Sequence, residues 1–188
     1  MAQQYNTLQE IRSSGKQPIL PFEETTLRAR LDELGVRQRD LGHLLGEVMD
    51  QSSETWHDNH AAEMIAADSR GLGDEAEKII RTLQTAYVAS YGSVEPEVPG
   101  GATLGSIVDI EFSPGDTVSM LLTGAISELP EDITVYYPGM EATTISSPLG
   151  AAVLNAQSGA EVTFEINQRS MGVKVGQIAV FGDMTQTG

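Results

Sequence analysis

The stretch from Leu27 to Val48 reads LRARLDELGVRQRDLGHLLGEV. Within it, leucine or valine recurs at alternating intervals of four and three residues, with glutamine at one position of the series. The series comprises Leu27, Leu31, Leu34, Gln38, Leu41, Leu45 and Val48. This heptad spacing is typical of a helix that packs along one stripe, here called the seam, against a second helix. The stretch therefore predicts a long helix that needs a partner.

A second series with the same spacing supplies that partner. It comprises Ala62, Ile65, Ser69, Leu72, Ala76, Ile79, Leu83 and Ala86. In an antiparallel helix pair the residue numbers of facing positions have a constant sum. Pairing Leu27 with Leu83, and so on up to Val48 with Ala62, gives 110 at every layer. The sequence thus predicts an antiparallel helical hairpin over 22–90 with its tip at Thr55.

Charge and composition exclude several classes of function. The 188 residues carry 27 acids against 11 bases, a net charge of −16, and no cysteine. Free binding to nucleic acid is not expected, because phosphate contacts need clustered Lys and Arg. Disulfides and cysteine-ligated zinc are excluded. We expect a cytoplasmic protein with no membrane span, since the chain lacks a run of about 18 apolar residues and its start resembles no signal peptide.

Composition shifts divide the chain into five segments. Pro18 and Pro21 end a polar stretch, and a second stretch rich in glycine and proline follows the hairpin. The predicted segments are a flexible arm over 1–21, the hairpin over 22–90, a linker over 91–104, a β-rich domain over 105–182 and a tail over 183–188. Gly71 and Gly73 predict a local bend or break in the second helix.

The β-rich domain shows alternating apolar residues and turn residues. The predicted strands are Ser106–Phe112, Thr117–Gly124, Ile133–Tyr137, Glu161–Asn167 and Val173–Phe181. Ser147 as N-cap and Pro148 at the first helical position predict one short helix. The expected fold class is α+β, an antiparallel helical hairpin followed by one sheet that carries one helix.

Two stretches of this domain resemble the C-terminal domain of the GreA/GreB transcript-cleavage factors. The first is LGSIVDIEF over 104–112. The second is SSPLGAAVLN over 146–155, which SGAEVTF over 158–164 follows. The resemblance in residues covers about 100–181, and the likeness in architecture reaches back to about residue 22. It implies an FKBP-like fold for the C-terminal domain.

The resemblance also implies a function. Gre factors bind bacterial RNA polymerase, with the FKBP-like domain at the rim of the secondary channel and the hairpin inside it. Acids at the hairpin tip help to hold a second Mg²⁺, and the polymerase then cleaves the 3′ end of backtracked RNA. The chain would be an accessory factor and no enzyme, a monomer without a cofactor of its own that meets nascent RNA only within the polymerase complex.

The family's tip acids map only partly onto this chain. Asp58 and the following Asn59 match the second acid and the asparagine of the family tip. Thr55 stands where the family has its first acid, so Glu54 or Asp50 would have to replace it. The resemblance therefore implies Asp58, Glu54 and Asp50 as acids lent to the polymerase Mg²⁺.

Two further groups of residues follow from the same resemblance. The family carries basic residues along the hairpin that contact extruded RNA, and Arg37, Arg39 and Arg70 are the candidates here. Ser147 and Pro148 are candidates for a contact with the polymerase rim, although helix capping alone would also explain them.

Three other interpretations stay open at this point. An inhibitory Gre homologue would occupy the channel without stimulating cleavage. A coiled-coil interaction module unrelated to transcription would not need its tip acids. A zinc enzyme would use His57, His60 and Glu63, whose spacing of three suits metal ligation on one helical face.

Overall fold

The computed structural model describes residues 5–51, 60–113 and 115–182. The chain divides into two compact units. The hairpin unit is Thr25–Gln84, and the globular unit combines Met1–Glu24 with Thr85–Gly188. The globular unit is therefore assembled from both sides of the hairpin rather than from the C-terminal half alone.

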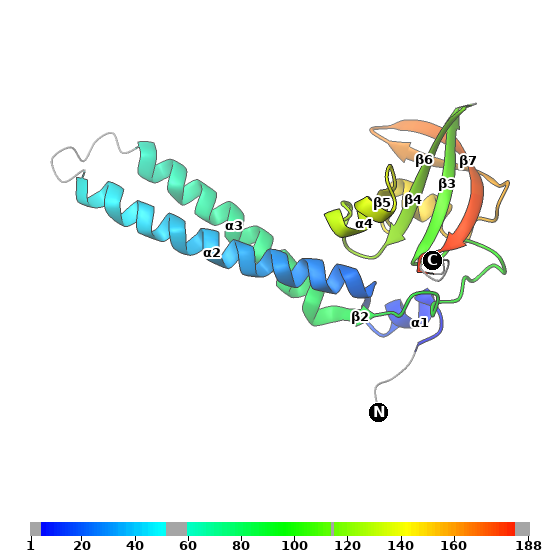
Figure 1. Ribbon diagram of the computed structural model, residues 1–188, viewed down its shortest axis with the longest axis horizontal. Coiled ribbons are helices and arrows are strands. Elements are labelled where there is room, and N and C mark those ends of the chain that lie inside the picture. The colour runs from blue at the N-terminus through cyan, green and yellow to red at the C-terminus, as the bar shows by residue number, and fades with distance from the viewer. Residues whose placement is uncertain (1–4, 52–59, 114, 183–188) are drawn as a thin grey trace. The chain divides into compact units, whose positions relative to one another are not determined.

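Two long helices form the hairpin unit (Figure 1). Helix α2 spans Pro21–Gln51 and α3 spans His60–Thr85, with 31 and 26 residues. The Arg30 guanidinium contacts the Glu75 carboxylate, and the Gln38 amide donates to Ser69 Oγ, so contacts advance along α2 while they recede along α3. The predicted antiparallel hairpin is confirmed. Gln38 was expected opposite Leu72, and its side chain reaches Ser69, which lies three residues from Leu72 on α3.

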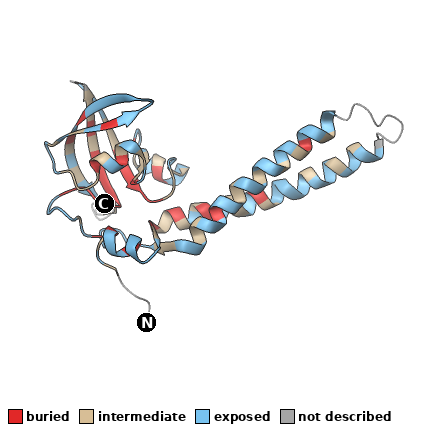
Figure 2. Cartoon of the chain, turned by 180° about the vertical axis from the view of Figure 1, so that it is seen from behind, coloured by how far each residue is buried: buried red, intermediate tan, exposed pale blue. Residues whose placement is uncertain are grey.

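Burial along the two helices follows the predicted seams. Leu27, Leu34, Ile65 and Ile79 are buried, and the other apolar members of the two series are half-buried. Figure 2 shows exposed residues along most of both helices. Gln38 is exposed, which fits its polar side chain. Among the described helices, none is long and apolar enough to cross a bilayer.

Helix α3 continues through its two glycines. It is a single helix from His60 to Thr85, so the expected break at Gly71 and Gly73 is absent from this described segment. The hairpin also ends before residue 90, because Ala86–Val88 form strand β2. Packing against α2 along the whole seam outweighs the cost of glycine, about 1 kcal/mol for each residue.

A charged contact between Arg30 and Glu75 joins the two helices. Arg30 Nε lies 2.7 Å from Glu75 Oε1, and its Nη2 lies 3.2 Å from Glu75 Oε2, while Nη1 lies 2.8 Å from Glu33 Oε2. Hydrogen bonding to Arg30 lowers the pKa of Glu75, and hydrogen bonding to Glu75 raises the pKa of Arg30. This two-pronged contact favours one register of the two helices.

Replacing Glu75 by glutamine is expected to lower the melting temperature of the hairpin unit. The pKa of Glu75 is below its ordinary value of 4.5 in the folded chain. Its contribution to stability is therefore present above the unfolded pKa and disappears as the pH falls through the lowered folded pKa. Melting curves followed by circular dichroism should differ between E75Q and wild type at neutral pH and converge in acid. The matched control is E77Q, since Glu77 pairs with Arg81 inside α3. An equal loss in both variants, or a difference that persists in acid, would contradict the cross-helix assignment.

A five-stranded sheet forms the centre of the globular unit, in the order β5-β4-β3-β7-β6. The strands are β3 (Ser106–Ser113), β4 (Asp116–Thr123), β5 (Glu141–Thr144), β6 (Glu161–Ile166) and β7 (Arg169–Val180). Only the β4–β5 pair is parallel; the pairs β3–β4, β3–β7 and β6–β7 are antiparallel. Four of the five predicted strands are confirmed as β3, β4, β6 and β7, and β5 is an additional strand.

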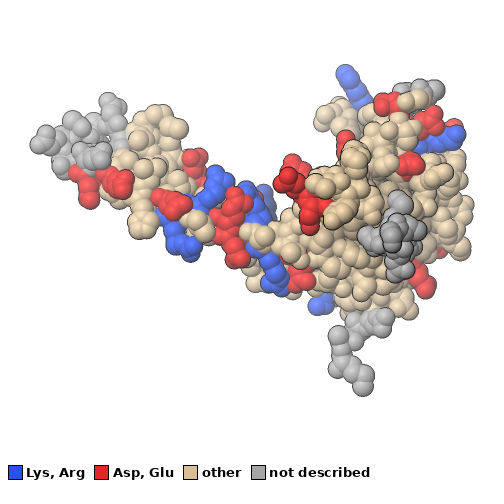
Figure 3. All heavy atoms as spheres, viewed as in Figure 1, with Lys and Arg blue, Asp and Glu red and all other residues tan. Residues whose placement is uncertain are grey.

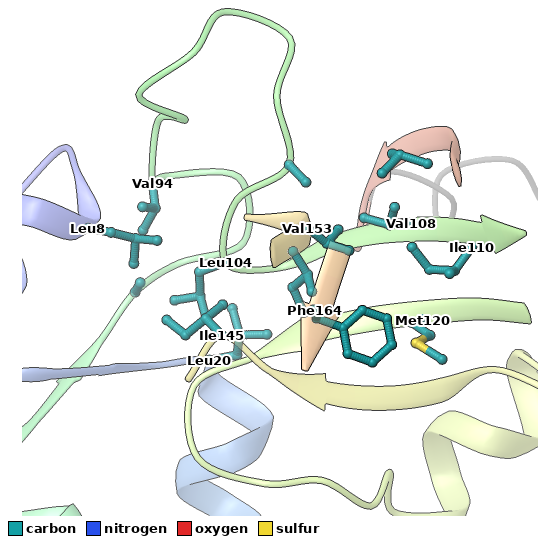
Figure 4. Packing of buried hydrophobic residues seen from close by; sticks show 14 of the residues in the cluster. Leu8, Leu20, Val94, Leu104, Val108, Ile110, Met120, Ile145, Val153 and Phe164 are labelled. Atoms are coloured by element: carbon teal, nitrogen blue, oxygen red, sulfur yellow. The ribbon is translucent and has the colours of Figure 1, made fainter. Parts of the chain in front are cut away.

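Both faces of the sheet bury apolar side chains. Val108 and Ile110 point into the larger cluster with Phe164 and Val153 (Figure 4). The alternate residues of the same strands contribute to a smaller cluster on the other face. The smaller cluster comprises Ile107, Leu121, Ile133, Met140 and Phe181. Helix α5 (Pro148–Val153) contributes Val153 to the larger cluster, and α4 (Glu131–Tyr136) contributes Ile133 to the smaller one.

The segment expected to be a flexible arm is folded over its described residues. Helix α1 (Leu8–Ser13) begins with a capping box between Thr7 and Glu10, and β1 (Gln17–Ile19) pairs in parallel with β2. Leu8, Ile11 and Leu20 are fully or almost fully buried in the larger cluster, which explains why the segment is held. The expectation of an arm over 1–21 does not hold for residues 5–21. The predicted linker is likewise buried at its end, over 101–104.

The predicted strand Ile133–Tyr137 is wrong, because these residues lie in and just after helix α4. Pro130 precedes the helix, and Glu131 and Asp132 lie in its first turn, where carboxylates favour a helix start. With a helical period, Ile133 and Tyr137 share one face. The domain therefore carries α4 as well as α5, instead of the single helix that was expected.

A buried carboxylate joins the start of α2 to the sheet. Glu23 is completely buried and accepts hydrogen bonds from the backbone N–H groups of Leu20, Gly124, Ala125 and Ile126, at 2.6–3.0 Å. Gly124 is required there, since a Cβ atom would lie 1.8 Å from the carbonyl oxygen of Pro18. Phe22 packs on Phe181 beside it, with ring centroids 5.9 Å apart. The first turn of α2 is thereby fixed within the globular unit.

Candidate functional site

Acidic side chains gather where the two helices of the hairpin are joined. Asp50 is exposed in the last turn of α2, and Glu47 is exposed one turn earlier. No basic residue lies in that last turn. Carboxylates at a helix C-terminus oppose the helix dipole, at a cost of roughly 0.3–1 kcal/mol each. Helix stability therefore gives no reason for acids at this end, and a partner outside the chain is the more direct explanation.

The principal tip residues of the sequence prediction cannot be placed. Glu54 and Asp58 lie outside the described residues, as do Thr55 and His57. On the other side of the connection, His60 and Glu63 are exposed in the first turn of α3. Among the described residues, no three His, Asp or Glu side chains come close enough to hold a metal ion. Of the three acids named from the sequence, the structure thus places Asp50 alone.

The three candidate arginines lie on the shaft of the hairpin. Arg37, Arg39 and Arg70 are all exposed. A rotation of about 100° per residue puts Arg37 and Arg39 roughly 200° apart around α2. Arg37 lines a hollow of about 520 Å³ between the two helices, together with Asp40 and Asp68. Figure 3 shows basic and acidic side chains interleaved along this part of the hairpin, so the shaft is mixed in charge rather than basic.

Ser147 and Pro148 begin helix α5 as predicted. Ser147 Oγ accepts a hydrogen bond from the Gly150 N–H at 3.0 Å and donates one to the Thr144 carbonyl at 2.8 Å. Gly150 is needed for this close packing, because a Cβ atom would lie 2.0 Å from the same carbonyl oxygen. The capping role of Ser147 is confirmed. Pro148 is exposed, so its ring is free to contact a partner.

Replacing Ser147 by alanine is expected to lower the free energy of unfolding by about 1 kcal/mol, the usual cost of a lost N-cap. Replacing Pro148 by alanine should leave stability nearly unchanged, because a proline at the first helical position completes no hydrogen bond. Chemical denaturation followed by circular dichroism measures both. If Pro148→Ala weakens partner binding at unchanged stability, the ring makes a contact. An equal stability loss in the two variants would contradict the capping assignment.

Sequence reasoning missed two features that bear on function. The anchoring role of Glu23 was missed because its hydrogen-bond partners after β4 lie about 100 positions away in the sequence. A proline at the first helical position with a glutamate two residues later is nevertheless a typical helix start, and Pro21 and Glu23 have this spacing. The exposed pair Val135 and Tyr136 was hidden because the segment was interpreted as a strand. A helix-start pattern at Pro130, Glu131 and Asp132 would have corrected that interpretation.

The chain was compared with known proteins by sequence and by structure. No protein-family model and no curated protein matches its sequence. Among solved structures it is similar to the GreA factor homolog Gfh1 of Thermus thermophilus, at 20% identity over 87% of this chain and 99% of that one, with a TM-score of 0.40. It is similar to Gfh1 of Thermus aquaticus at 19% identity, over 87% and 97% of the two chains, with a TM-score of 0.39.

A further similar structure is the transcription elongation factor GreA/GreB of Nitrosomonas europaea, at 14% identity over 87% and 98% of the two chains, with a TM-score of 0.30. The neighbours are thus Gre and Gfh1 factors, the family named from the residues of the C-terminal domain.

Proposed function

We propose that the chain is a Gre-like transcription factor that binds bacterial RNA polymerase at the secondary channel and modulates elongation. The observation that carries the proposal is that α2 ends at the joined end of the hairpin with Glu47 and Asp50, against the preference of its helix dipole. Helix α2 alone has 31 residues. At a rise of 1.5 Å per residue it spans about 45 Å, enough to carry carboxylates deep into a narrow channel.

The chemistry of phosphoryl transfer gives these acids a task. Mg²⁺ prefers oxygen ligands and usually takes one or two carboxylates from protein. Cleavage of a phosphodiester by two metal ions needs both ions held in place. The tip acids Asp58, Glu54 and Asp50 would complete the coordination of a weakly held ion that belongs to the polymerase. The chain itself is proposed to have no active site.

The globular unit supports the same proposal through charge and through its Ser-Pro helix. Its basic residues are Arg12, Lys16, Arg169 and Lys174. No Lys or Arg lies between Arg81 and Arg169, a span that includes most of the sheet. Such an acidic unit is suited to a basic protein surface. Pro148 at the exposed start of α5 is the proposed contact of this unit with the channel rim.

An assay of transcript cleavage in backtracked elongation complexes tests the proposal. The wild-type chain is expected to raise the cleavage rate above that of the polymerase alone. A second candidate function is inhibition, which Thr55 favours because a hydroxyl stands where the family has a carboxylate. Slower RNA synthesis without added cleavage would select the inhibitor. Failure to bind the polymerase would refute both and favour an interaction module outside transcription.

A further inference from the structure

Helix α4 exposes two large side chains that belong to neither of the two hydrophobic clusters. Val135 is 69% exposed and Tyr136 is 81% exposed. The opposite side of the helix is fully engaged, since Ile133 is buried and Tyr137 packs on Phe181 with ring centroids 5.5 Å apart. The helical period that buries Ile133 and Tyr137 is what turns the intervening pair outward.

Neither side chain is favoured by local structure. Valine and tyrosine are weaker helix formers than alanine or leucine, and both have high β-propensity. Neither takes part in the two hydrophobic clusters defined by the described residues. Isolated exposed apolar residues are ordinary, but an adjacent pair with an aromatic ring is typical of the centre of a protein–protein contact.

Exposed acidic residues lie close to the pair in the sequence. Glu128, Glu131 and Asp132 are exposed in and just before α4, and Glu141 is exposed at the start of β5. Figure 3 shows acidic side chains gathered over this part of the globular unit. The nearest basic residues in the sequence are Arg81 and Arg169. An apolar centre with an acidic rim matches a basic partner surface that presents an apolar side chain.

We propose that residues 128–136, the α4 surface, bind a segment of the polymerase in which Lys or Arg residues flank an apolar side chain. The proposal rests on the function proposed above, because it assigns a surface to the same partner. None of the stretches that carry the Gre resemblance includes these residues. A nucleic acid is the wrong occupant, since the acidic rim repels phosphates. A second copy is disfavoured as well, because two such surfaces would bring like charges together.

Binding of the full chain to purified core RNA polymerase tests the α4 surface. The test variant is the pair Val135→Ser and Tyr136→Ser. The matched control is the pair Ile166→Ser and Met171→Ser, which replaces exposed apolar residues of the same unit, 44% and 41% exposed. The α4 pair is expected to raise the Kd about tenfold, and the control pair less than about twofold. Melting curves of both variants should coincide with that of wild type.

The acidic rim has its own test. The pair Glu131→Gln and Asp132→Asn keeps the shapes but removes two charges, so the Kd should depend less steeply on salt concentration than that of wild type. Wild-type binding with an unchanged Kd in the α4 pair would overturn the α4 surface and leave the proposed function standing. No binding by wild type would overturn both. A loss of self-association in the α4 pair, seen by sedimentation, would assign the surface to a second copy instead.

Discussion

Replacing Asp58 by alanine is expected to lower the rate of factor-stimulated RNA cleavage about 10- to 100-fold, the range found when a group that supports a metal site is removed. The reason is that alanine offers no oxygen to Mg²⁺, while the polymerase keeps its own ligands. The measurement is the first-order rate of cleavage in stalled, backtracked complexes at a saturating concentration of factor. Asp58 matches the family's second acid and lies three residues after Thr55, the expected centre of the tip.

The control for this variant is Asp68→Ala. Asp68 is an exposed aspartate on the shaft of α3, so its loss removes the same charge away from the tip. Its cleavage rate should equal that of wild type, and both variants should bind the polymerase with wild-type affinity. The complementary variant Thr55→Asp restores a carboxylate where the family has one and should raise the rate. Equal rates in D58A and wild type would remove the tip acid from the mechanism.

The hairpin could be predicted because its period is repeated over many turns. Each of the two series places an apolar residue at nearly every seam position, and burial follows both. The contacts between side chains could not be predicted, because the index sum compares Cα positions only. Gln38 contacts Ser69, and Arg30 contacts Glu75.

Short helices and strands were harder to predict from the sequence than the hairpin. Ile133–Tyr137 alternates apolar and polar residues over only five positions, too few to separate a strand from a helix by period alone. The burial of Leu8, Ile11 and Leu20 in the N-terminal segment was missed for another reason. Leu8, Ile11 and Leu20 look unremarkable among polar neighbours, and only their packing against residues of the distant sheet orders the segment. Tertiary contacts of this kind leave no local pattern.

Some residues of the candidate site could also be predicted from a local motif, and others could not. Ser147 was predicted with its capping role, because the N-cap and the following proline form a local motif. The RNA-contacting role of Arg37, Arg39 and Arg70 stays a prediction, and similar height along a hairpin does not by itself place Arg37 and Arg39 on the same side of a helix. The α4 surface required the helix itself to be known. Of the predicted tip acids, Asp50 alone lies among the described residues, in the last turn of α2.

Replacing Glu23 by alanine is expected to lower the free energy of unfolding of the globular unit by about 3 kcal/mol. The substitution leaves four backbone N–H groups without their acceptor, and two of these, in Leu20 and Gly124, are buried. Unsatisfied buried donors cost roughly 1–3 kcal/mol each, and removal of a buried charged partner reaches 3–5 kcal/mol. Partial access of water to Ala125 and Ile126 keeps the expected loss at the lower end.

The variant Glu23→Gln tests whether the charge and the acceptor oxygens of Glu23 stabilise the fold, or only the size of its side chain. Both carboxylate oxygens of Glu23 are in use, Oε1 on three N–H groups and Oε2 on two, with the Gly124 N–H shared. Glutamine has nearly the same size, but its NH₂ group would replace one acceptor oxygen and face backbone N–H groups, which are also donors. Glu23→Gln should therefore lower the free energy of unfolding by about 1–3 kcal/mol. Glu47→Ala, an exposed glutamate of the same helix, should stay within about 0.5 kcal/mol of wild type. Calorimetry is the suitable measurement, because two units need not unfold together. If Glu23→Gln melts like wild type, shape alone holds the first turn of α2, and the carboxylate has no anchoring role.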